Sequence, residues 1–266
     1  MSDADILFAI REEVAVLTLN RPERMNAWTL AMETGLRSAF ERAEADPGAR
    51  VILLTGVGRA FCAGADMDAV AAEDGTTPQS TAAPPPREGD FSQRYSYLMA
   101  GRKPLIAAIN GGTAGVGFVL PLFADIRLVA ESAKMTSAFA RRGFVAEHGS
   151  AWLLQRLIGP MNAADLLLSG RTIRGTEAAS LGLCRALADE GFAEAAFDYA
   201  REIAASCSPR SMAVMKAQLS AAYTQSLAEA TRLADRELER CHGTPDMAEG
   251  IAHFLERRPP RFPPLA

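Results

Sequence analysis

Blocks of apolar residues along the first two thirds of the chain are short and predict strands rather than helices. Residues 6–10 and 14–19 alternate or run apolar around the polar Arg11-Glu12-Glu13, which predicts a β-hairpin. The runs at 51–55 and 105–109 are continuously apolar, as in strands that are buried on both faces. A further strand is predicted at 125–130.

Between these strands, and from about residue 189 to the end, the apolar residues follow helical spacing. Thr29 is a plausible cap for a helix that runs to residue 45 and ends before Pro47. A second helix is predicted at 91–101. The C-terminal helices are expected at 192–206, 208–223, 225–241 and 246–256. Strands that alternate with helices predict an α/β fold with a mostly parallel sheet, closed by a C-terminal helical subdomain.

Residues 73–90 lack periodicity and contain four prolines. A long loop without structure in a compact domain is often functional, and we expect this segment to be mobile. A surface insertion without a function is the competing interpretation.

Composition narrows the class of protein. The chain has 266 residues, 48% hydrophobic and 23% charged, with a net charge of −4. These values are typical of a globular protein and carry no electrostatic signature of nucleic-acid binding. The four cysteines show no metal-ligand spacing, the N-terminus is acidic where a signal peptide would be basic, and no apolar run reaches ~18 residues. We therefore expect a cytoplasmic protein with reduced thiols, without a bound metal and not embedded in a membrane.

Two strand–loop–helix units have loops rich in small residues. The strand at 51–55 leads to Ala60-Phe-Cys-Ala-Gly-Ala-Asp66, and the strand at 105–109 leads to Asn110-Gly-Gly-Thr-Ala-Gly-Val-Gly117. Small residues allow the backbone to approach a ligand closely. The unpaired N–H groups of a first helical turn favour developing negative charge. Both loops are therefore candidates for binding an anionic group.

Four motifs occur in the order and spacing of one family. They are NRPERMNAW (20–28), FCAGADM (61–67), INGGTAGVG (109–117) and RTIRGTEAASLGL (171–183). Together they resemble the crotonase, or enoyl-CoA hydratase/isomerase, superfamily over essentially the whole chain. The resemblance implies the ClpP/crotonase spiral of ββα units. It also implies a core of residues 1–190 for acyl-CoA binding and catalysis, and a helical subdomain of residues 191–266 for assembly into a homotrimer or a dimer of trimers.

By this resemblance the substrate is an acyl-CoA thioester, with coenzyme A as part of the substrate and no other cofactor. The N–H groups of Ala65 and Val116 would form an oxyanion hole for the thioester oxygen. Valine stands at 116 where the family usually has glycine, but a backbone donor needs no particular side chain. Residues expected near CoA are Arg24, Met25, Ala27, Ala63, Ala65, Asp66, Met67, Asp68 and Val116, with Arg24 as a partner for a phosphate.

The usual catalytic pair of the family is not found at the matching positions. Carried over residue by residue, the two glutamates that position water fall on Val119 and Phe139. Glu147 lies where certain relatives have a working aspartate. Burial would raise its pKa and suit it to acid/base work, and His148 is a second candidate. The alternatives are that Glu147 caps a helix and that His148 packs against a neighbour.

One carboxylate suits proton shuttling better than water addition. We therefore predict an enoyl-CoA isomerase or an atypical enoyl-CoA hydratase (a lyase) of fatty acid metabolism, with Glu147 as the acid/base. The main alternative is a non-catalytic acyl-CoA binding protein, and a hydrolase or decarboxylase that uses the same enolate is a third. A dinucleotide site is disfavoured because Leu120 replaces the third glycine of the fingerprint. Candidate lining residues of the acyl pocket are Phe91, Tyr95, Phe139, Phe144 and Trp152.

Overall fold

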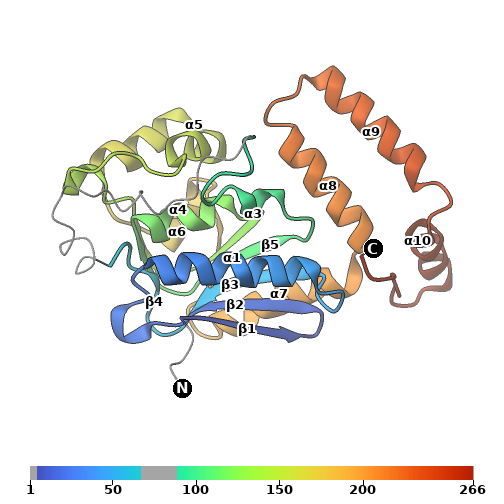
Figure 1. Cartoon of the computed structure of the whole chain (residues 1–266), viewed down its shortest axis with the longest axis horizontal. Coiled ribbons are helices and arrows are strands. Elements are labelled where there is room, and N and C mark those ends of the chain that lie inside the picture. Colours follow the sequence, from blue (N-terminus) through green and yellow to red (C-terminus); the bar gives the residue numbers. More distant parts are fainter. Residues whose placement is uncertain (1–4, 67–88, 266) are drawn as a thin grey trace.

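The computed structural model describes residues 5–66 and 89–265 (Figure 1). Most of the predicted loop at 73–90 lies outside the described residues. Strands β1 (Ile6–Arg11) and β2 (Val14–Leu19) form the predicted antiparallel hairpin. Its two turn residues, Glu12 and Glu13, both have positive φ, 45° and 63°. Two-residue hairpin turns favour this conformation because its twist matches that of the strands.

A six-stranded sheet forms the core, in the order β1-β2-β3-β5-β7-β10, and its pairs beyond the hairpin are parallel. The added strands are β3 (Val51–Gly56), β5 (Leu105–Ile109), β7 (Ile126–Ala130) and β10 (Arg185–Leu187). Every residue of β5 is buried, as are the first four of β3. The continuously apolar runs of the sequence thus lie at the centre of the sheet, where both faces are covered.

A second, smaller sheet follows the order β4-β6-β8-β9. Its strands are β4 (Ala60–Cys62), β6 (Gly112–Ala114), β8 (Lys134–Thr136) and β9 (Ile173–Arg174). Strands β4, β6 and β8 come directly after β3, β5 and β7, so the chain passes three times from the large sheet into the small one in the same way. This repetition of strand pairs is the predicted α/β spiral.

The helices cover the large sheet and extend the chain beyond it (Figure 1). Helix α1 (Leu30–Ala45) packs on β1 and β2, and the side chain of Thr29 caps it by accepting from the Met32 amide at 3.2 Å. Helix α7 (Phe192–Ser206) packs on β2, β3 and β5. The remaining helices are α3 (Tyr97–Ala100), α4 (Val116–Val119), α5 (Ser150–Ser169), α6 (Gly175–Ser180), α8 (Pro209–Ala221), α9 (Leu227–Cys241) and α10 (Pro245–Glu256). Single 3-10 turns are η1 (Pro22–Arg24), η3 (Leu120–Phe123) and η4 (Ala140–Arg142).

Helices α8, α9 and α10 stand to one side of the core, and α8 is tied back to it by a buried lysine (Figure 1). The Nζ atom of Lys216 donates to the Lys103 carbonyl at 2.9 Å and to Asp125 Oδ2 at 2.8 Å. Helices α9 and α10 expose large apolar side chains to solvent in the single chain, among them Leu238, Ile251 and Phe254. The division of the chain at residue 190 stays a prediction.

One predicted helix is much shorter in the structure. The segment 91–101 was expected to be helical throughout, but only Tyr97–Ala100 is helical and the residues before it form turns. The reason is tertiary: the Arg94 side chain is bound to Glu33 of α1, and the Gln93 amide donates to Ser96 Oγ at 2.9 Å. These bonds compete with helical ones.

Candidate active site

The first glycine-containing loop follows β4 and is held by the segment at 25–28. The Ala63 amide donates to the Met25 carbonyl at 3.1 Å, and the Trp28 amide donates to Gly64 at 2.7 Å. Trp28 then accepts from the Asp66 amide at 3.0 Å. The two bonds of Trp28 flank Ala65, so the N–H of Ala65 points away from Trp28.

Asn26 fixes the other side of this segment. It is fully buried and adopts φ 54°, a left-handed conformation that asparagine tolerates better than most residues. Its side-chain nitrogen donates to the Val57 and Ala60 carbonyls at 3.0 and 2.8 Å, and its oxygen accepts from the Arg21 amide at 2.8 Å. The motif at 20–28 therefore serves as a brace for the first loop.

The second loop touches the first through backbone atoms. Gly115, at φ 53°, turns the chain out of β6 into α4, and Val116 is the first residue of that helix. A methyl group on Gly117 would lie 2.1 Å from the Cys62 carbonyl oxygen, and one on Gly64 would lie 3.1 Å from that of Ala114. Only glycine at 117 allows α4 to approach β4 so closely. The small residues of the two motifs thus act on each other as well as on any ligand.

The two predicted oxyanion donors lie on these adjoining loops. Within residues 5–66 and 89–265, neither the Ala65 nor the Val116 amide donates a hydrogen bond to the protein. Val116 is 5% exposed. A polar N–H group in a buried position is costly unless it finds an acceptor, so both amides are available to one.

The predicted CoA-binding residues around the first loop fall into two groups. Met25, Ala27, Ala63 and Ala65 line its exposed or half-buried side. Asp66 is buried and ties two arginines together: its Oδ2 accepts from Arg21 at 3.1 Å and its Oδ1 accepts from Arg24 at 3.1 Å. Arg24, the predicted phosphate partner, keeps 45% of its side chain exposed. Predicted residues Met67 and Asp68 lie outside the described residues.

Glu147 and His148 lie together at the entrance to α5. His148 has φ 53° and Gly149 follows at φ 79°, so the chain turns sharply before the helix. The Oε2 atom of Glu147 is 3.5 Å from His148 Nε2, and their side chains are 35% and 19% exposed. Burial raises the pKa of Glu147, opposed by the positive charge of Arg94. Burial and the same arginine lower the pKa of His148 to about 4, against the opposing effect of Glu33. His148 is therefore neutral at pH 7.

Two charged residues near the Glu147–His148 pair, Glu33 and Arg94, were not predicted from the sequence. Glu33 of α1 accepts from Arg94 Nε at 2.8 and 2.9 Å and from the Tyr95 hydroxyl at 3.1 Å. Glu33 follows the core residue Met32 and lies on the buried face of α1, which is the signal that could have singled it out. Arg94 has no comparable local signal, because its partner is 61 residues away.

The two positions to which the resemblance carries the family's glutamates are part of the core. Val119 is fully buried and Phe139 is 5% exposed. Of the other predicted lining residues, Tyr95 is buried, whereas Phe144 and Trp152 are 45% and 38% exposed. Cys62 is fully buried, and burial raises the pKa of its thiol to about 12, which disfavours a nucleophilic role.

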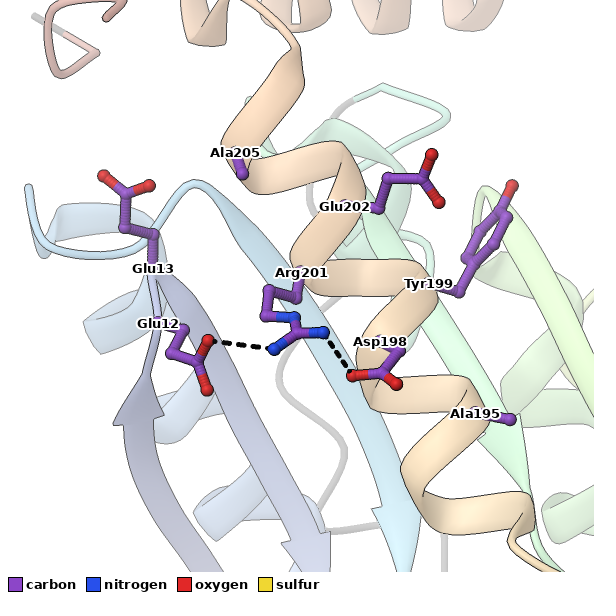
Figure 2. Close-up of a pocket in the computed structure, with 8 residues that line it drawn as sticks. All are labelled: Glu12, Glu13, Ala195, Asp198, Tyr199, Arg201, Glu202 and Ala205. Atoms are coloured by element: carbon purple, nitrogen blue, oxygen red, sulfur yellow. Dashed lines mark hydrogen bonds and ion pairs between the residues drawn. The ribbon is translucent and has the colours of Figure 1, made fainter. Parts of the chain in front are cut away.

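A separate open groove of about 710 Å³ lies between the β1–β2 turn and α7 (Figure 2). It is lined by Glu12, Glu13, Ala195, Asp198, Tyr199, Arg201, Glu202 and Ala205. Arg201 bridges Glu12 at 3.3 Å and Asp198 at 2.8 Å, as the dashed lines in Figure 2 mark. None of these residues belongs to the two loops, and four carboxylates repel phosphates. This groove is therefore a poor candidate for a CoA site.

Residues 5–66 and 89–265 show neither a metal-ligand cluster nor a helix able to cross a membrane. There, no group of three or more His, Cys, Asp or Glu side chains is arranged to hold a metal ion. No helix in the same ranges has both the length and the apolar character needed to span a bilayer.

Comparisons with known proteins identify the family. The sequence profile described as Enoyl-CoA hydratase/isomerase matches residues 9–264. A 1,2-epoxyphenylacetyl-CoA isomerase of Escherichia coli is 34% identical, over 97% of both chains. A probable enoyl-CoA hydratase of Rhodobacter capsulatus is 36% identical, over 98% of this chain and 99% of that protein.

A solved structure extends the likeness to three dimensions. The crystal structure of a probable enoyl-CoA hydratase/isomerase from Mycobacterium abscessus superimposes with a TM-score of 0.86 at 36% identity, covering 98% of this chain and 99% of that one. The resemblance inferred from the four motifs and the predicted fold are thereby confirmed. This chain belongs to the enoyl-CoA hydratase/isomerase family of the crotonase superfamily.

Proposed function

We propose that the protein is an acyl-CoA enzyme that stabilises a thioester enolate between the amides of Ala65 and Val116, with Glu147 as the acid/base. The observation that carries the proposal is the backbone contact between the two loops, which brings two unused N–H groups onto adjoining segments. Two N–H donors placed in this way are suited to an oxyanion as their common acceptor. One donor of this kind is typically worth ~10²–10³ in rate.

The chemistry assigned to Glu147 is a proton transfer. Its carboxylate removes a proton from the carbon next to the thioester, and the electron pair moves onto the carbonyl oxygen between the two amides. The proton then returns at another carbon of the acyl chain, which moves the double bond. Partial burial raises the pKa of Glu147 and makes it a stronger base than an exposed glutamate.

Isomerisation is favoured over ordinary hydration because Val119 and Phe139 stand at the positions of the usual glutamates. Both are apolar and packed in the core, so neither can hold or activate a water molecule. An atypical hydratase that relies on Glu147 alone is the other form of the same proposal.

CoA would lie along the first loop, against Met25, Ala27, Ala63 and the Asp66 backbone, with Met67, Asp68 and Val116 completing the predicted set. Arg24 would reach a phosphate, since much of its side chain is exposed and its charge is shared with Arg21 across one carboxylate. We further propose assembly into a trimer or a dimer of trimers through α8–α10, whose exposed apolar residues need cover, and a cytoplasmic role in fatty acid metabolism.

The test of turnover is deuterium exchange at the carbon next to the thioester, followed by mass spectrometry over a panel of acyl-CoA thioesters. The wild-type protein should exchange at least one of them. Glu147→Gln should reduce that rate by about 10²–10⁴-fold because the amide cannot accept the proton. Glu194→Gln, an exposed residue of α7, is the matched control and should behave like the wild type.

A second candidate function, acyl-CoA binding without catalysis, is favoured by the same two apolar positions, Val119 and Phe139. It predicts tight binding of acyl-CoA and no exchange by the wild-type protein. If the wild-type protein exchanges and Glu147→Gln exchanges at the same rate, the protein is an enzyme but Glu147 is not its base.

A further inference from the structure

A break inside helix α5 separates the half that follows the Glu147 turn from the half that continues to residue 169. Gly159 has φ 78° and ψ 162°, which are not helical values, and Pro160 follows it. Proline has no N–H group to continue the helical hydrogen bonds, so residues 150–158 and 160–169 are two consecutive helices with a bend between them. The direction of the first half is therefore not fixed by that of the second half.

The two halves of α5 are attached to the protein in different ways. The end of the second half is bonded to β8 and the residue after it: Ser137 Oγ donates to the Leu166 carbonyl at 2.9 Å, and Thr136 Oγ1 donates to the Gly170 carbonyl at 2.9 Å. In the part of the chain that the structure describes, no side chain of residues 150–158 forms a hydrogen bond or an ion pair outside α5. Packing alone therefore sets the direction of the first half.

The turn that carries Glu147 is bonded to this first half. The amide of Ser150, the first residue of α5, donates to the Glu147 carbonyl at 2.9 Å. One step further on, the Leu153 amide donates to the Gly149 carbonyl at 3.0 Å. A rotation of the first half therefore displaces the backbone of Glu147 with it.

Trp152, in the first turn of α5, contacts a tyrosine of the C-terminal helices. The ring of Tyr223, which follows α8, lies 5.0 Å from the Trp152 ring between centroids, with the planes at 43°. The guanidinium of Arg156 lies 3.7 Å from the centroid of the same Trp152 ring, and its Nη1 donates to the Trp152 carbonyl at 3.1 Å. Because aromatic pairs prefer particular geometries, the Tyr223 ring restricts the orientation of Trp152.

Tyr223 is in turn fixed by the attachment of α8 to the core. The Tyr223 amide donates to the Ser220 carbonyl at 3.3 Å, and the Ser220 hydroxyl donates to the Met99 carbonyl at 3.3 Å. Two turns earlier on α8, Lys216 Nζ donates to Asp125 Oδ2 at 2.8 Å. A chain of printed contacts thus leads from the core through α8 and Tyr223 to the half-helix behind Glu147.

We propose that Tyr223 is a positioning residue: its ring, held by α8, sets through Trp152 the direction of the first half of α5 and hence the place of Glu147. This inference rests on the proposed role of Glu147 as the base. Tyr223 does not touch the reacting atoms, and the α8–α9 turn acts on turnover only through the half-helix. Displacing a catalytic group by about 1 Å costs on the order of 10²-fold in rate, so even a small rotation is measurable.

The experiment measures the deuterium exchange rate against the concentration of the accepted acyl-CoA. In Tyr223→Ala the rate at saturation should fall about 3- to 30-fold, because the base is displaced. The half-saturating concentration should change by less than about 2-fold, because the loops proposed to bind CoA are untouched. Tyr223→Phe keeps the ring and should restore the rate. Tyr199→Ala removes a half-buried tyrosine of α7, away from α5, and is the matched control that should behave like the wild type.

A double variant tests whether Tyr223 acts through Trp152. If it does, Trp152→Ala and Trp152→Ala/Tyr223→Ala should exchange at rates within about 2-fold of each other, because the second change has nothing left to act on. Tryptophan emission gives an independent readout. Trp28 and Trp152 are the two tryptophans of the chain, and Trp28 is buried, so a shift to longer wavelength in Tyr223→Ala reports the loss of the ring contact at Trp152.

The inference is overturned if Tyr223→Ala keeps the wild-type rate, or if it raises only the half-saturating concentration, since Tyr223 would then bind substrate. Independent losses that multiply in the double variant, a failure of Tyr223→Phe to restore the rate, or a loss of rate without a change in emission overturn it as well. If Tyr223→Ala does not fold, Tyr223→Leu takes its place: it keeps an apolar side chain without a ring and should lose rate in the same direction.

A parallel measurement on Glu147→Gln keeps the two proposals apart. Loss of exchange in Glu147→Gln together with a wild-type rate in Tyr223→Ala removes only the inference about Tyr223. Full exchange in Glu147→Gln removes the base itself, and the inference with it.

Discussion

The two halves of the candidate site are built in different ways. The two glycine-containing loops meet through backbone atoms, and glycine at 117 is what lets them meet. The Glu147 half depends on side chains: a half-buried carboxylate, a histidine in a left-handed conformation and a cluster of charged residues behind them. In the backbone half the N–H groups are independent of side-chain identity, but the approach of the loops requires a residue without a side chain at 117. A half made of side chains can change its chemistry while the fold stays the same.

This difference accounts for the mixture of family likeness and departure in one chain. The loop motifs at 61–67 and 109–117 carry the resemblance to the family, and a side chain at Gly117 would collide with the Cys62 carbonyl oxygen. Val119 and Phe139, to which the resemblance carries the family's two glutamates, are core residues, and the proposed acid/base is the carboxylate at 147. The predictions below test whether the two halves are as different as the contacts indicate.

The largest effect is expected from Gly117→Ala. Its methyl group would lie 2.1 Å from the Cys62 carbonyl oxygen. The methyl carbon is fixed by the backbone at 117 and the oxygen belongs to the backbone at 62, so neither atom can rotate away. Chemical denaturation should show a loss of about 2–4 kcal/mol in the free energy of unfolding. The exchange rate should fall on the order of 10²-fold as one donor moves out of line.

The matched control for this variant is Gly112→Ala in the same motif. A methyl group at 112 would meet its nearest neighbour, the Ala60 side chain, at 4.0 Å, an ordinary contact. It should therefore leave stability and exchange close to the wild type. Equal behaviour of the two variants would show that the close approach at 117 does not hold the loops together.

The backbone half was also the half that the sequence could predict. Runs of apolar residues placed the hairpin and strands β3 and β5, because local periodicity decides which faces are buried. The glycine-rich motifs placed both loops by resemblance. Helix α7 was predicted at 192–206 and lies at Phe192–Ser206.

The contacts of the side-chain half could not be predicted from local sequence patterns. The segment 91–101 has helical periodicity, but a bond from Arg94 to Glu33 on α1 prevents most of the helix. That contact joins residues far apart in the chain, and no local pattern encodes it. A glutamate on the buried face of α1 indicates that a partner must neutralise its charge, but the sequence does not identify that partner as Arg94.

The second prediction concerns the dependence of stability on pH. The pKa of His148 is lowered by burial to about 4 in the folded protein, whereas an unfolded histidine has its ordinary value of 6.5. Between these values the unfolded chain binds more protons than the folded one, so stability falls as pH falls from 6.5 toward 4. The contribution of His148 to this loss is up to about 3 kcal/mol.

Urea denaturation of the wild type and His148→Asn at pH 7.5 and 4.5 measures that contribution. Asparagine tolerates the left-handed backbone at 148, so the turn is preserved. The loss of stability between the two pH values should be smaller in the variant by up to about 3 kcal/mol, since carboxylates that titrate in the same range are common to both proteins. An identical loss in both proteins would mean that His148 is not held neutral by its surroundings.

The smallest effect on the exchange rate is expected from Val116→Gly, which replaces the valine by the residue that the resemblance leads us to expect there. The proposed function of position 116 belongs to its N–H group, so removal of the side chain should change the exchange rate by less than about 3-fold. Stability should fall by about 2–4 kcal/mol, because a buried valine side chain is lost and glycine is unfavourable in a helix. The effect on exchange can be compared directly with that of Glu147→Gln, in which a single side-chain change should remove most of the rate. If Val116→Gly instead raised or abolished exchange on one class of acyl-CoA, the valine side chain would itself be part of substrate selection, and the separation between a backbone half and a side-chain half would fail at this residue.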